Sequence, residues 1–260
     1  MGNRFKQHWI NKAKTGRSEQ IVFGTVYGQE YSRTHDKATF AKIAVDLNFG
    51  KHETILDVGC GPLARPEYQY APQHLIVGMD IARENVKKAQ STVQDADFVV
   101  ADAEHLPFKQ DYFSRVLCIG LISHLPSKKC VQDSLKDVQR ILRVGGIAYL
   151  PWWMNSIGFT MIERRFAMKL MDLLRVGHAQ YLGFNGKSEV FGLLQNARLK
   201  LRSMECSETL EFPWLFYWLP TKLRLALRKL VDKVNSCGLN RLPCSFNVTA
   251  TCAKSKVPLF

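Results

Sequence analysis

Short apolar runs alternate with helical patterns through the middle of this chain of 260 residues, and that alternation limits the folds open to it. Such a series indicates βαβ units, in which parallel strands form a sheet and helices cover both of its faces. The expected strands are Ile55–Val58, Leu75–Met79, Phe98–Val100, Val116–Ile119, Ile147–Leu150, Leu199–Met204 and Asn247–Ala253. The predicted fold class is therefore α/β, built on a parallel sheet.

Helical segments flank these strands. From Val131 to Leu142, apolar residues recur at the period of an α-helix, and Gly145-Gly146 is expected to end that helix. A helix at Asp36–Leu47 should cover one edge of the sheet, and another is expected at Lys187–Ala197, before the last two strands. No internal repeat or low-complexity linker divides the chain, so one domain with insertions is favoured over two.

A segment of different composition separates the last two strands. Aromatic residues crowd between Pro213 and Pro220, and a helix is predicted at Thr221–Asn235. Its leucines fall on one face and its basic residues largely elsewhere, so this helix is basic and amphipathic. Packing of the apolar face onto the domain is the commoner arrangement. A lid, or attachment to an anionic membrane surface, is the alternative.

The basic charge of the chain is unevenly distributed. Lys and Arg outnumber Asp and Glu by 8 to 4 in residues 1–50 and by 16 to 7 in residues 151–260, whereas residues 51–150 carry 12 of each. The net charge of +13 therefore comes entirely from the two flanks. Such flanks suit a lipid surface, a phosphate-bearing substrate or nucleic acid, and equally a solubilising surface.

Composition argues against secretion, membrane spanning and metal binding. There is no apolar run long enough to cross a bilayer, and no signal peptide is expected, because residues 1–23 contain no apolar core of the kind that such peptides have. The seven cysteines are scattered without a Cys-x-x-Cys pair, which favours reduced thiols over a disulfide framework or a zinc site. We expect a cytoplasmic protein without a metal, either free or attached peripherally to a membrane.

A glycine turn follows the first expected strand. Gly59 and Gly61 would let the backbone approach a ligand, and the stretch from Gly59 to Ala64 also satisfies the loose dinucleotide fingerprint G-x-G-x-x-A. Asp57 separates the two interpretations, because a carboxylate beside the turn would repel a pyrophosphate. The same carboxylate attracts the sulfonium and ammonium groups of S-adenosylmethionine, so that cofactor is favoured and a dinucleotide oxidoreductase is a distant alternative.

Four motifs in order resemble the class I S-adenosylmethionine-dependent methyltransferases, in the small-molecule branch that includes the UbiE-like and Methyltransf_11-like domains. They are Asp57-Val-Gly-Cys-Gly61, Val77-Gly-Met-Asp80 with Ile81, Ala101-Asp-Ala-Glu-His-Leu-Pro-Phe108 and Ile141-Leu-Arg-Val-Gly-Gly146. The resemblance implies a Rossmann-like fold with a mostly parallel seven-stranded sheet and a C-terminal helical insertion. The chain departs from the family at Leu63, where a third glycine is usual.

The resemblance also implies roles for individual residues. Asp80 would bind the ribose hydroxyls and Ile81 would pack on the adenine face. Asp102 would accept a hydrogen bond from the adenine amino group, and the Ala103 amide would read a ring nitrogen. Gly120 would approach the methionyl part. The alternative for Asp80 and Asp102 is helix capping, but acidic residues at the ends of consecutive strands fit the ligand crevice of an open α/β sheet.

His124 is the candidate general base, because members of the family often carry a histidine there beside the cofactor; a loop histidine that bonds locally is the alternative. His178, Tyr181, Tyr27 and Tyr31 are secondary candidates. The fourth strand is followed by Ile-Ser-His rather than by the motifs of nucleic-acid methyltransferases, which favours a small acceptor. Apolar residues in Pro151–Phe159 would add acceptor surface, with core packing as the alternative.

Residues 1–52 are thus expected to form an N-terminal helical cap and residues 53–150 the cofactor-binding core. Residues 151–260 would complete the same domain, with an insertion at about 212–240. The expected function is methyl transfer to an O, N or C atom of an apolar or amphiphilic molecule, such as a quinone, polyketide, lipid or lipid-linked sugar. An RNA methyltransferase that uses the basic flanks, and a non-catalytic membrane-surface module, are the alternatives.

Overall fold

The computed structural model describes most of the sheet and the helices that pack on it. The described residues are 2–15, 43, 45, 47, 52–62, 74–153, 182–208, 220, 222–223, 226–227, 229–230, 233 and 246–254. Within them the strands are β1 (Thr54–Val58), β2 (Leu75–Asp80), β3 (Asp97–Val100), β4 (Phe113–Leu117), β5 (Leu142–Trp153), β6 (Leu199–Glu208) and β7 (Phe246–Lys254). The helices are α1 (Gly2–Lys14), α4 (Arg83–Thr92), α5 (Lys128–Ile141) and α7 (Lys187–Asn196), with a 3₁₀ turn at Ile122–His124.

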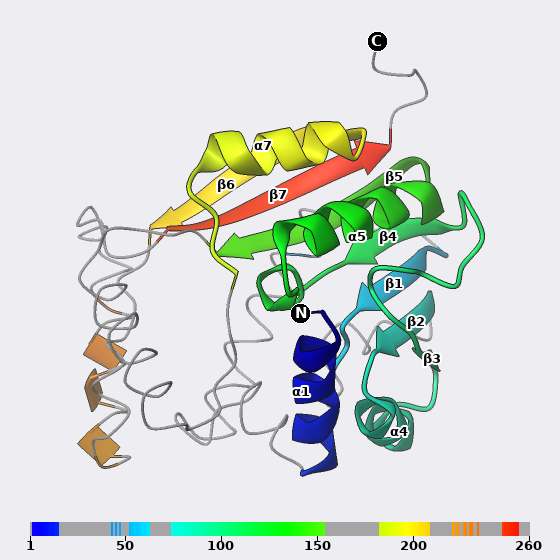
Figure 1. The fold of residues 1–260 in the computed structure, drawn as a ribbon, viewed down its shortest axis with the longest axis vertical. Coiled ribbons are helices and arrows are strands. Elements are labelled where there is room, and N and C mark those ends of the chain that lie inside the picture. Colours follow the sequence, from blue (N-terminus) through cyan, green and yellow to red (C-terminus); the bar gives the residue numbers. More distant parts are fainter. Residues whose placement is uncertain are drawn as a thin grey trace.

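All seven strands form one sheet in the order β3-β2-β1-β4-β5-β7-β6 (Figure 1). Strands β1 to β5 pair in parallel, whereas β7 runs antiparallel to both β5 and β6. The predicted α/β class and the mostly parallel seven-stranded sheet are confirmed. No helix among the described residues is long and apolar enough to cross a membrane.

Side chains of the central strands alternate between two apolar layers. Leu56 and Val58 face a layer that contains the buried residues of α5 and α7, and both helices lie on the same face of the sheet (Figure 1). Ile55 points into the second layer, where it packs with Ile43 and Leu47. Both faces of β1 are therefore buried, as the continuous apolar run predicts for a central parallel strand.

Helix α5 is where the sequence predicted a helix, but it begins earlier. Ser127 caps it, because the Ser127 hydroxyl accepts a hydrogen bond from the Cys130 amide at 3.2 Å. The buried residues on the helix are Val131, Ser134, Leu135, Val138 and Ile141. Their spacing of three and four residues places one stripe against the sheet.

The prediction that Gly145-Gly146 ends this helix is wrong. The helix ends at Ile141, and Leu142 already has the extended backbone of β5, with φ −70° and ψ 129°. The glycines instead lie in an irregular part of β5, because Phe113 pairs with Leu142 while Arg115, two residues on, pairs with Ile147. Gly145 has a φ of 76° there, which glycine adopts without strain.

The fourth strand is displaced from its predicted position. It runs from Phe113 to Leu117 rather than from Val116 to Ile119, and all five of its residues are buried. Ser114 and Arg115 interrupt the apolar pattern in the sequence, so the pattern located only the second half of the strand. Their polar groups are satisfied by the network described below, which explains why they can be buried.

The other expected helices and strands agree with the structure within a few residues, except that β5 and β6 are longer. In Asp36–Leu47 and Thr221–Asn235, the residues that the structure describes are helical, and the remaining residues of both ranges lie outside the described part.

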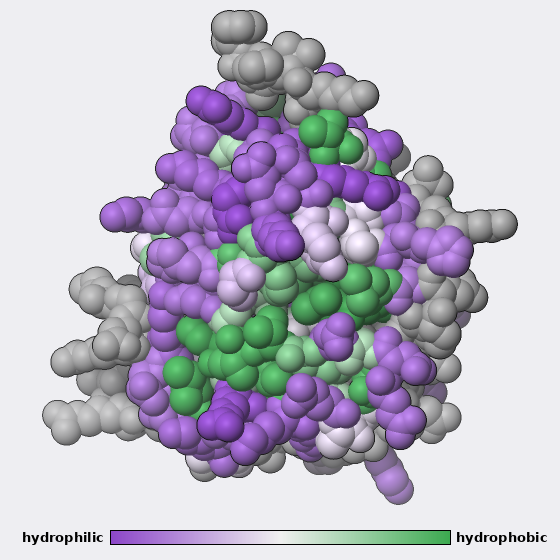
Figure 2. Space-filling view, turned by 90° about the vertical axis from the view of Figure 1, so that its right-hand side faces the viewer, coloured by the Kyte–Doolittle hydropathy of each residue, from purple (hydrophilic) through white to green (hydrophobic). Residues whose placement is uncertain are grey.

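At the β3 edge of the sheet, Val100 is 47% exposed. The side of the molecule on which β3 lies carries an apolar patch surrounded by hydrophilic side chains (Figure 2).

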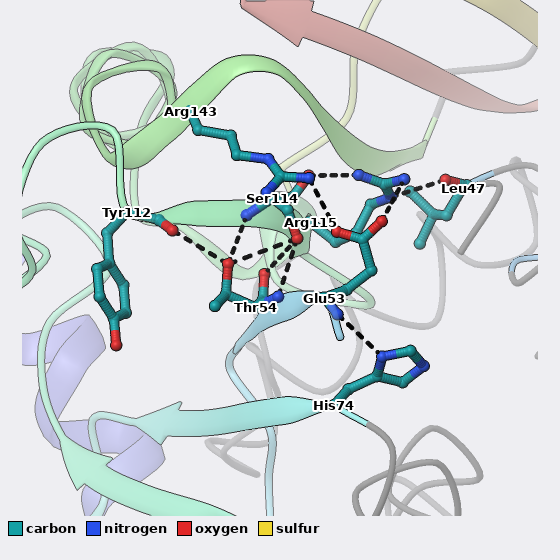
Figure 3. Close-up of polar contacts among 8 residues, drawn as sticks. All are labelled: Leu47, Glu53, Thr54, His74, Tyr112, Ser114, Arg115 and Arg143. Atoms are coloured by element: carbon teal, nitrogen blue, oxygen red, sulfur yellow. Dashed lines mark hydrogen bonds and ion pairs between the residues drawn. The ribbon is translucent and has the colours of Figure 1, made fainter. Parts of the chain in front are cut away.

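A buried ion pair joins the amino ends of the central strands (Figure 3). The Glu53 carboxylate, which precedes β1, lies 3.0 Å from the guanidinium of Arg115 on β4 and 3.1 Å from that of Arg143 on β5. Glu53 and Arg115 are only 4% and 7% exposed. Arg115 also donates to the carbonyl oxygen of Leu47 at 2.7 Å. One buried charge pair thus links β1, β4, β5 and the segment that covers the sheet.

Neutral contacts complete this network (Figure 3). The Glu53 amide donates to Nδ1 of His74 at 3.1 Å, and burial lowers the pKa of His74, which keeps the ring neutral and able to accept. The Thr54 amide donates to the Ser114 hydroxyl at 3.0 Å, and the Ser114 amide donates to the Thr54 hydroxyl at 3.0 Å. These contacts fix the starting points of β1, β2 and β4.

We expect Glu53→Gln to lower the free energy of unfolding by about 3 kcal/mol, because it leaves the buried Arg115 charge uncompensated. Urea denaturation followed by circular dichroism measures this loss. Glu84→Gln, in the first turn of α4, is the matched control and should change the same free energy by less than about 0.5 kcal/mol. Equal effects of the two substitutions would show that the pair does not stabilise the fold.

Candidate functional site

Four parallel strands end at the same edge of the sheet. Their last residues are Val58, Asp80, Val100 and Leu117. The order of the strands reverses between β1 and β4, because β2 and β3 lie on one side of β1 and β4 and β5 lie on the other. Ligands of open α/β sheets bind outside the carboxyl ends of the strands at such a reversal. The predicted site residues lie at this edge.

The glycine turn after β1 folds back onto β2. The amides of Gly59 and Cys60 both donate to the Met79 carbonyl oxygen, at 2.8 and 2.9 Å. Gly59 and Gly61 have φ angles of 78° and 69°, a region that favours glycine. A Cβ atom at Gly61 would meet no described atom within 4 Å, although Gly61 is buried. Among the described residues, no atom therefore crowds the backbone of this turn at Gly61.

Asp57 and Asp80 flank this turn in different environments. Asp57 is fully buried within β1. Asp80 is half-buried, and its Oδ2 atom accepts a hydrogen bond from the Gly61 amide at 3.1 Å. Its Oδ1 atom accepts from the Ala82 amide at 2.8 Å and from the Asn85 side chain at 3.2 Å. Asp80 thus joins the glycine turn to the segment that begins α4. It does not cap that helix as one interpretation of the sequence allowed, because the N-cap residue is Ala82 and no side chain caps the helix.

Asp102 lies next to Asp80 along the sheet edge. Asp80 pairs with Val100, and the Ala101 amide donates to the Asp80 carbonyl oxygen at 3.1 Å. Oδ1 of Asp102 accepts from the Glu104 amide at 3.0 Å. Ala103, between them, is 8% exposed. This contact of the Asp102 side chain lies within a turn, and Asp102 does not cap a helix as one interpretation of the sequence allowed.

Two charged residues of α5 hold the loop that carries Asp102. Arg140 donates to the carbonyl oxygens of Leu106 at 2.8 Å and Phe108 at 2.7 Å, and Asp137 accepts from the Leu106 amide at 2.5 Å. Arg140 and Asp137 also pair with each other at 2.7 Å, and this contact raises the pKa of Arg140. The loop is consequently fixed to a helix that is itself anchored in the core.

An interaction that the sequence did not reveal joins α1 to this loop. The Lys6 ammonium lies 2.5 Å from Oδ2 of Asp102 and 2.7 Å from Oε1 of Glu104. Burial opposes the charge on Lys6, but hydrogen bonds to the two carboxylates outweigh it and raise the pKa of Lys6. Because Lys6 is one of several basic residues near the start of the chain, no pattern in the sequence singled it out.

His124 ends the 3₁₀ turn after β4 and contacts helix α1. Its ring meets the Trp9 ring edge-to-face, with centroids 4.7 Å apart. Gly120, before this turn, has a φ of 70°, and a Cβ there would meet no described atom within 4 Å. A Cβ at Gly59 would lie 3.3 Å from Leu121, so the glycine turn and the loop after β4 are neighbours.

The structure therefore brings the glycine turn, Asp57, Asp80 and the loop after β4 together, with Asp102 next to them under α1. Ile81 is half-buried directly after β2. Trp152 is fully buried against Phe184, with ring centroids 4.9 Å apart, so this residue packs in the core and does not form acceptor surface. Other residues that the sequence analysis singled out lie outside the described residues: Tyr27, Tyr31, Leu63, His178, Tyr181 and the aromatic residues between Pro213 and Pro220.

These groups suit a cofactor that carries hydroxyl, amine and sulfonium functions. Carboxylates accept hydrogen bonds from hydroxyl and amino groups and attract positive charge. No described residue crowds the positions where a Cβ would stand at Gly61 and Gly120, and glycine lets a ligand approach the backbone closely. The residues present fit S-adenosylmethionine better than a pyrophosphate-bearing dinucleotide, since Asp57 beside the glycine turn would repel phosphate.

Comparison with known proteins agrees with this assignment. The family model described as a methyltransferase domain, Methyltransf_11, matches residues 56–150. Ubiquinone biosynthesis O-methyltransferase of Xanthomonas oryzae is 28% identical over 166 residues, which cover 62% of this chain and 67% of that protein. The chain spans about half the length of the first curated relatives that it matches.

Solved structures share the fold. A S-adenosylmethionine-dependent methyltransferase of Methanosarcina mazei covers 82% of this chain, with 97% of its own length matched, a TM-score of 0.55 and 15% identity. The [4+2]-cyclase SpnF covers 96% of this chain, with 97% of its own length matched, a TM-score of 0.63 and 14% identity. Residues 56–150 are therefore a methyltransferase domain, in a chain that has the fold of the class I S-adenosylmethionine-dependent methyltransferases.

Proposed function

We propose that this protein transfers the methyl group of S-adenosylmethionine to an O, N or C atom of a small apolar or amphiphilic acceptor. The observation that carries the proposal is the position of Asp57 and Asp80 beside a glycine turn and of Asp102 after the next strand, at the strand ends where open α/β sheets bind ligands. The family match over residues 56–150 supports it.

Each acidic residue has a distinct task in this proposal. Asp80 accepts hydrogen bonds from the two ribose hydroxyls, and Asp102 accepts one from the adenine amino group. Both carboxylates already accept hydrogen bonds from the chain, and two carboxylate oxygens provide about four lone-pair positions. Asp102 therefore has room for the amino group, whereas Asp80 accepts three hydrogen bonds and must release one, such as that from the Asn85 side chain, to accept both hydroxyls. Asp57 lies deeper and contributes negative potential that favours the sulfonium and ammonium groups.

Backbone groups complete the cofactor site. The Ala103 amide donates a hydrogen bond to a ring nitrogen of adenine, while Ile81 packs against one face of the ring. Gly59, Gly61 and Gly120 present bare backbone to the methionyl part of the cofactor, which their positive φ angles make accessible. These residues bind and orient, and proximity is the main catalytic contribution that such a site makes.

The cofactor supplies a methyl group that is already activated by the positive sulfur. The chain must then position the acceptor and exclude water. Where the acceptor is a hydroxyl, His124 takes its proton. The edge-to-face contact with Trp9 fixes the orientation of the His124 ring, so the base is held in place beside the cofactor site.

Two observations favour an apolar or amphiphilic acceptor. The loop after β4 reads Ile122-Ser123-His124 and lacks the proline motifs typical of nucleic-acid methyltransferases. A relative carries the name ubiquinone biosynthesis O-methyltransferase, which supports a quinone-like molecule as one candidate. SpnF has the same fold but is named a [4+2]-cyclase, so the fold alone does not indicate which acceptor the protein uses.

Isothermal titration with S-adenosylhomocysteine tests the cofactor site. We expect Asp80→Asn and Asp102→Asn each to weaken binding by about tenfold or more, because each removes a charged acceptor. Asp95→Asn, at an exposed position before β3, is the matched control and should bind like the unaltered protein. Thermal unfolding of each variant checks that the fold is intact. Undiminished binding by a folded Asp102→Asn protein would refute its assignment.

The ion pairs of Lys6 predict a second effect. We expect Lys6→Met to speed amide hydrogen exchange in α1, because the helix loses its charged contacts with Asp102 and Glu104. The global free energy of unfolding should fall by only about 1 kcal/mol or less, since these groups are partly exposed. Lys14→Met, at the exposed end of the same helix, is the control. Unchanged exchange in Lys6→Met would show that Lys6 does not anchor α1.

The acceptor class is tested with methyl-labelled S-adenosylmethionine and fractionated cell extract. We expect label in the fraction that partitions into organic solvent, and loss of that label in Asp102→Asn. Label in RNA would contradict the proposed acceptor and favour the RNA-directed alternative, whose binding should weaken steeply with salt. Absence of transfer to every fraction, from a protein that binds the cofactor, would contradict the methyltransferase activity itself.

A further inference from the structure

An exposed apolar row lies on the helical segment between β6 and β7. The residues that the structure describes there are helical at 222, 223, 226, 227, 229, 230 and 233. Leu223 is 48% exposed and Leu230 is 57% exposed, while Leu227 is half-buried. The arrangement in which the apolar face packs wholly onto the domain, the commoner one for such a helix, therefore does not hold for Leu223 and Leu230.

A second row of this helix is basic. With about 100° of rotation per residue, Leu223, Leu227 and Leu230 fall within one narrow sector of the helix. Lys222 and Lys229, together with Lys233, fall in a neighbouring sector about a quarter turn away. All three lysines are exposed. The described surface of this helix thus presents an apolar stripe with a basic stripe beside it.

We propose that this helix docks on the surface of an anionic membrane. A lipid surface can bind the apolar stripe and the basic stripe at the same time. The leucines enter the boundary between headgroups and acyl chains, and the lysines bind lipid phosphates. The carboxyl-terminal part of the chain adds positive charge that attracts an anionic membrane, since residues 151–260 carry 16 basic and 7 acidic residues. The long aliphatic stems of the lysines let their charges reach the headgroups while the leucines insert.

Other partners fit less of the surface. Nucleic acid would bind the lysines and leave Leu223 and Leu230 in water. In Figure 1 the described residues of this segment lie at the margin of the molecule, away from β3 and α4. Docking through them does not require the cofactor site to change, and the proposal stands independently of the enzymatic one.

Co-sedimentation of the full chain with vesicles tests the proposal. We expect binding to vesicles of phosphatidylcholine mixed with phosphatidylglycerol, and much weaker binding to phosphatidylcholine alone. The double substitution Leu223→Gln with Leu230→Gln should weaken binding to the mixed vesicles by about tenfold or more, because it removes the inserted apolar groups. Lys222→Gln with Lys229→Gln should weaken it by about tenfold as well, and that loss should be greatest at low salt.

Matched substitutions at other exposed positions serve as controls. Phe191→Gln with Val144→Gln removes two apolar side chains that are 44% and 40% exposed elsewhere on the surface. Lys87→Gln with Lys200→Gln removes two exposed lysines. Both control proteins should bind the mixed vesicles as the unaltered chain does, and circular dichroism should show that every variant is folded.

Three outcomes would overturn the proposal. The first is a lack of binding to mixed vesicles by the unaltered chain. The second is equal binding by the control and the Leu223→Gln, Leu230→Gln proteins, which would place the contact elsewhere. In the third outcome, the unaltered chain binds a single-stranded RNA oligomer but not vesicles, and Lys222→Gln with Lys229→Gln abolishes the binding to RNA. None of these results depends on whether the protein transfers methyl groups.

Discussion

The pairing of Glu53 with Arg115 is the constraint around which the central sheet is arranged. Both groups are buried, and each gains further hydrogen bonds or ion pairs, so the cost of removing two charges from water is offset by well-placed partners. The pair lies where β1 and β4 begin and extends to β5 through Arg143. Because the strands run in parallel, fixing their amino ends also fixes where their carboxyl ends stop. The glycine turn and Asp80 therefore meet at the opposite edge of the sheet.

Apolar periodicity was enough to predict the fold class and most of the helices and strands, because a buried parallel strand and an amphipathic helix each leave a regular pattern. It failed where polar residues were buried. Ser114 and Arg115 broke the pattern of β4, and only their partners in space, Thr54 and Glu53, explain why they can be inside. Gly145 and Gly146 predict the end of a helix, whereas in the structure they allow an irregular stretch of β5, and the sequence around them does not show how β5 pairs with β4.

Some residues of the candidate site could likewise be predicted from sequence patterns, and others could not. Asp57, Asp80, Asp102 and the glycines were found in the sequence because they stand in motifs next to recognisable strands. Lys6 and Trp9 were not, because they reach the site from a helix far away in the sequence, and their contacts with Asp102 and His124 depend on how α1 packs. Long-range contacts between polar side chains have no periodicity, so sequence patterns reveal the strand-end residues of such a site before they reveal the residues that cover it.

The structural contacts of the acidic residues and their proposed roles support each other. Asp80 is oriented by the amides of Gly61 and Ala82, and Asp102 by the Glu104 amide and Lys6. All of these are donors, and together they hold each carboxylate in one direction. A carboxylate that is already oriented needs little rearrangement when a hydroxyl or amino group approaches it. The hydrogen bonds that hold Asp80 and Asp102 in place are thus also what prepares them to bind a ligand.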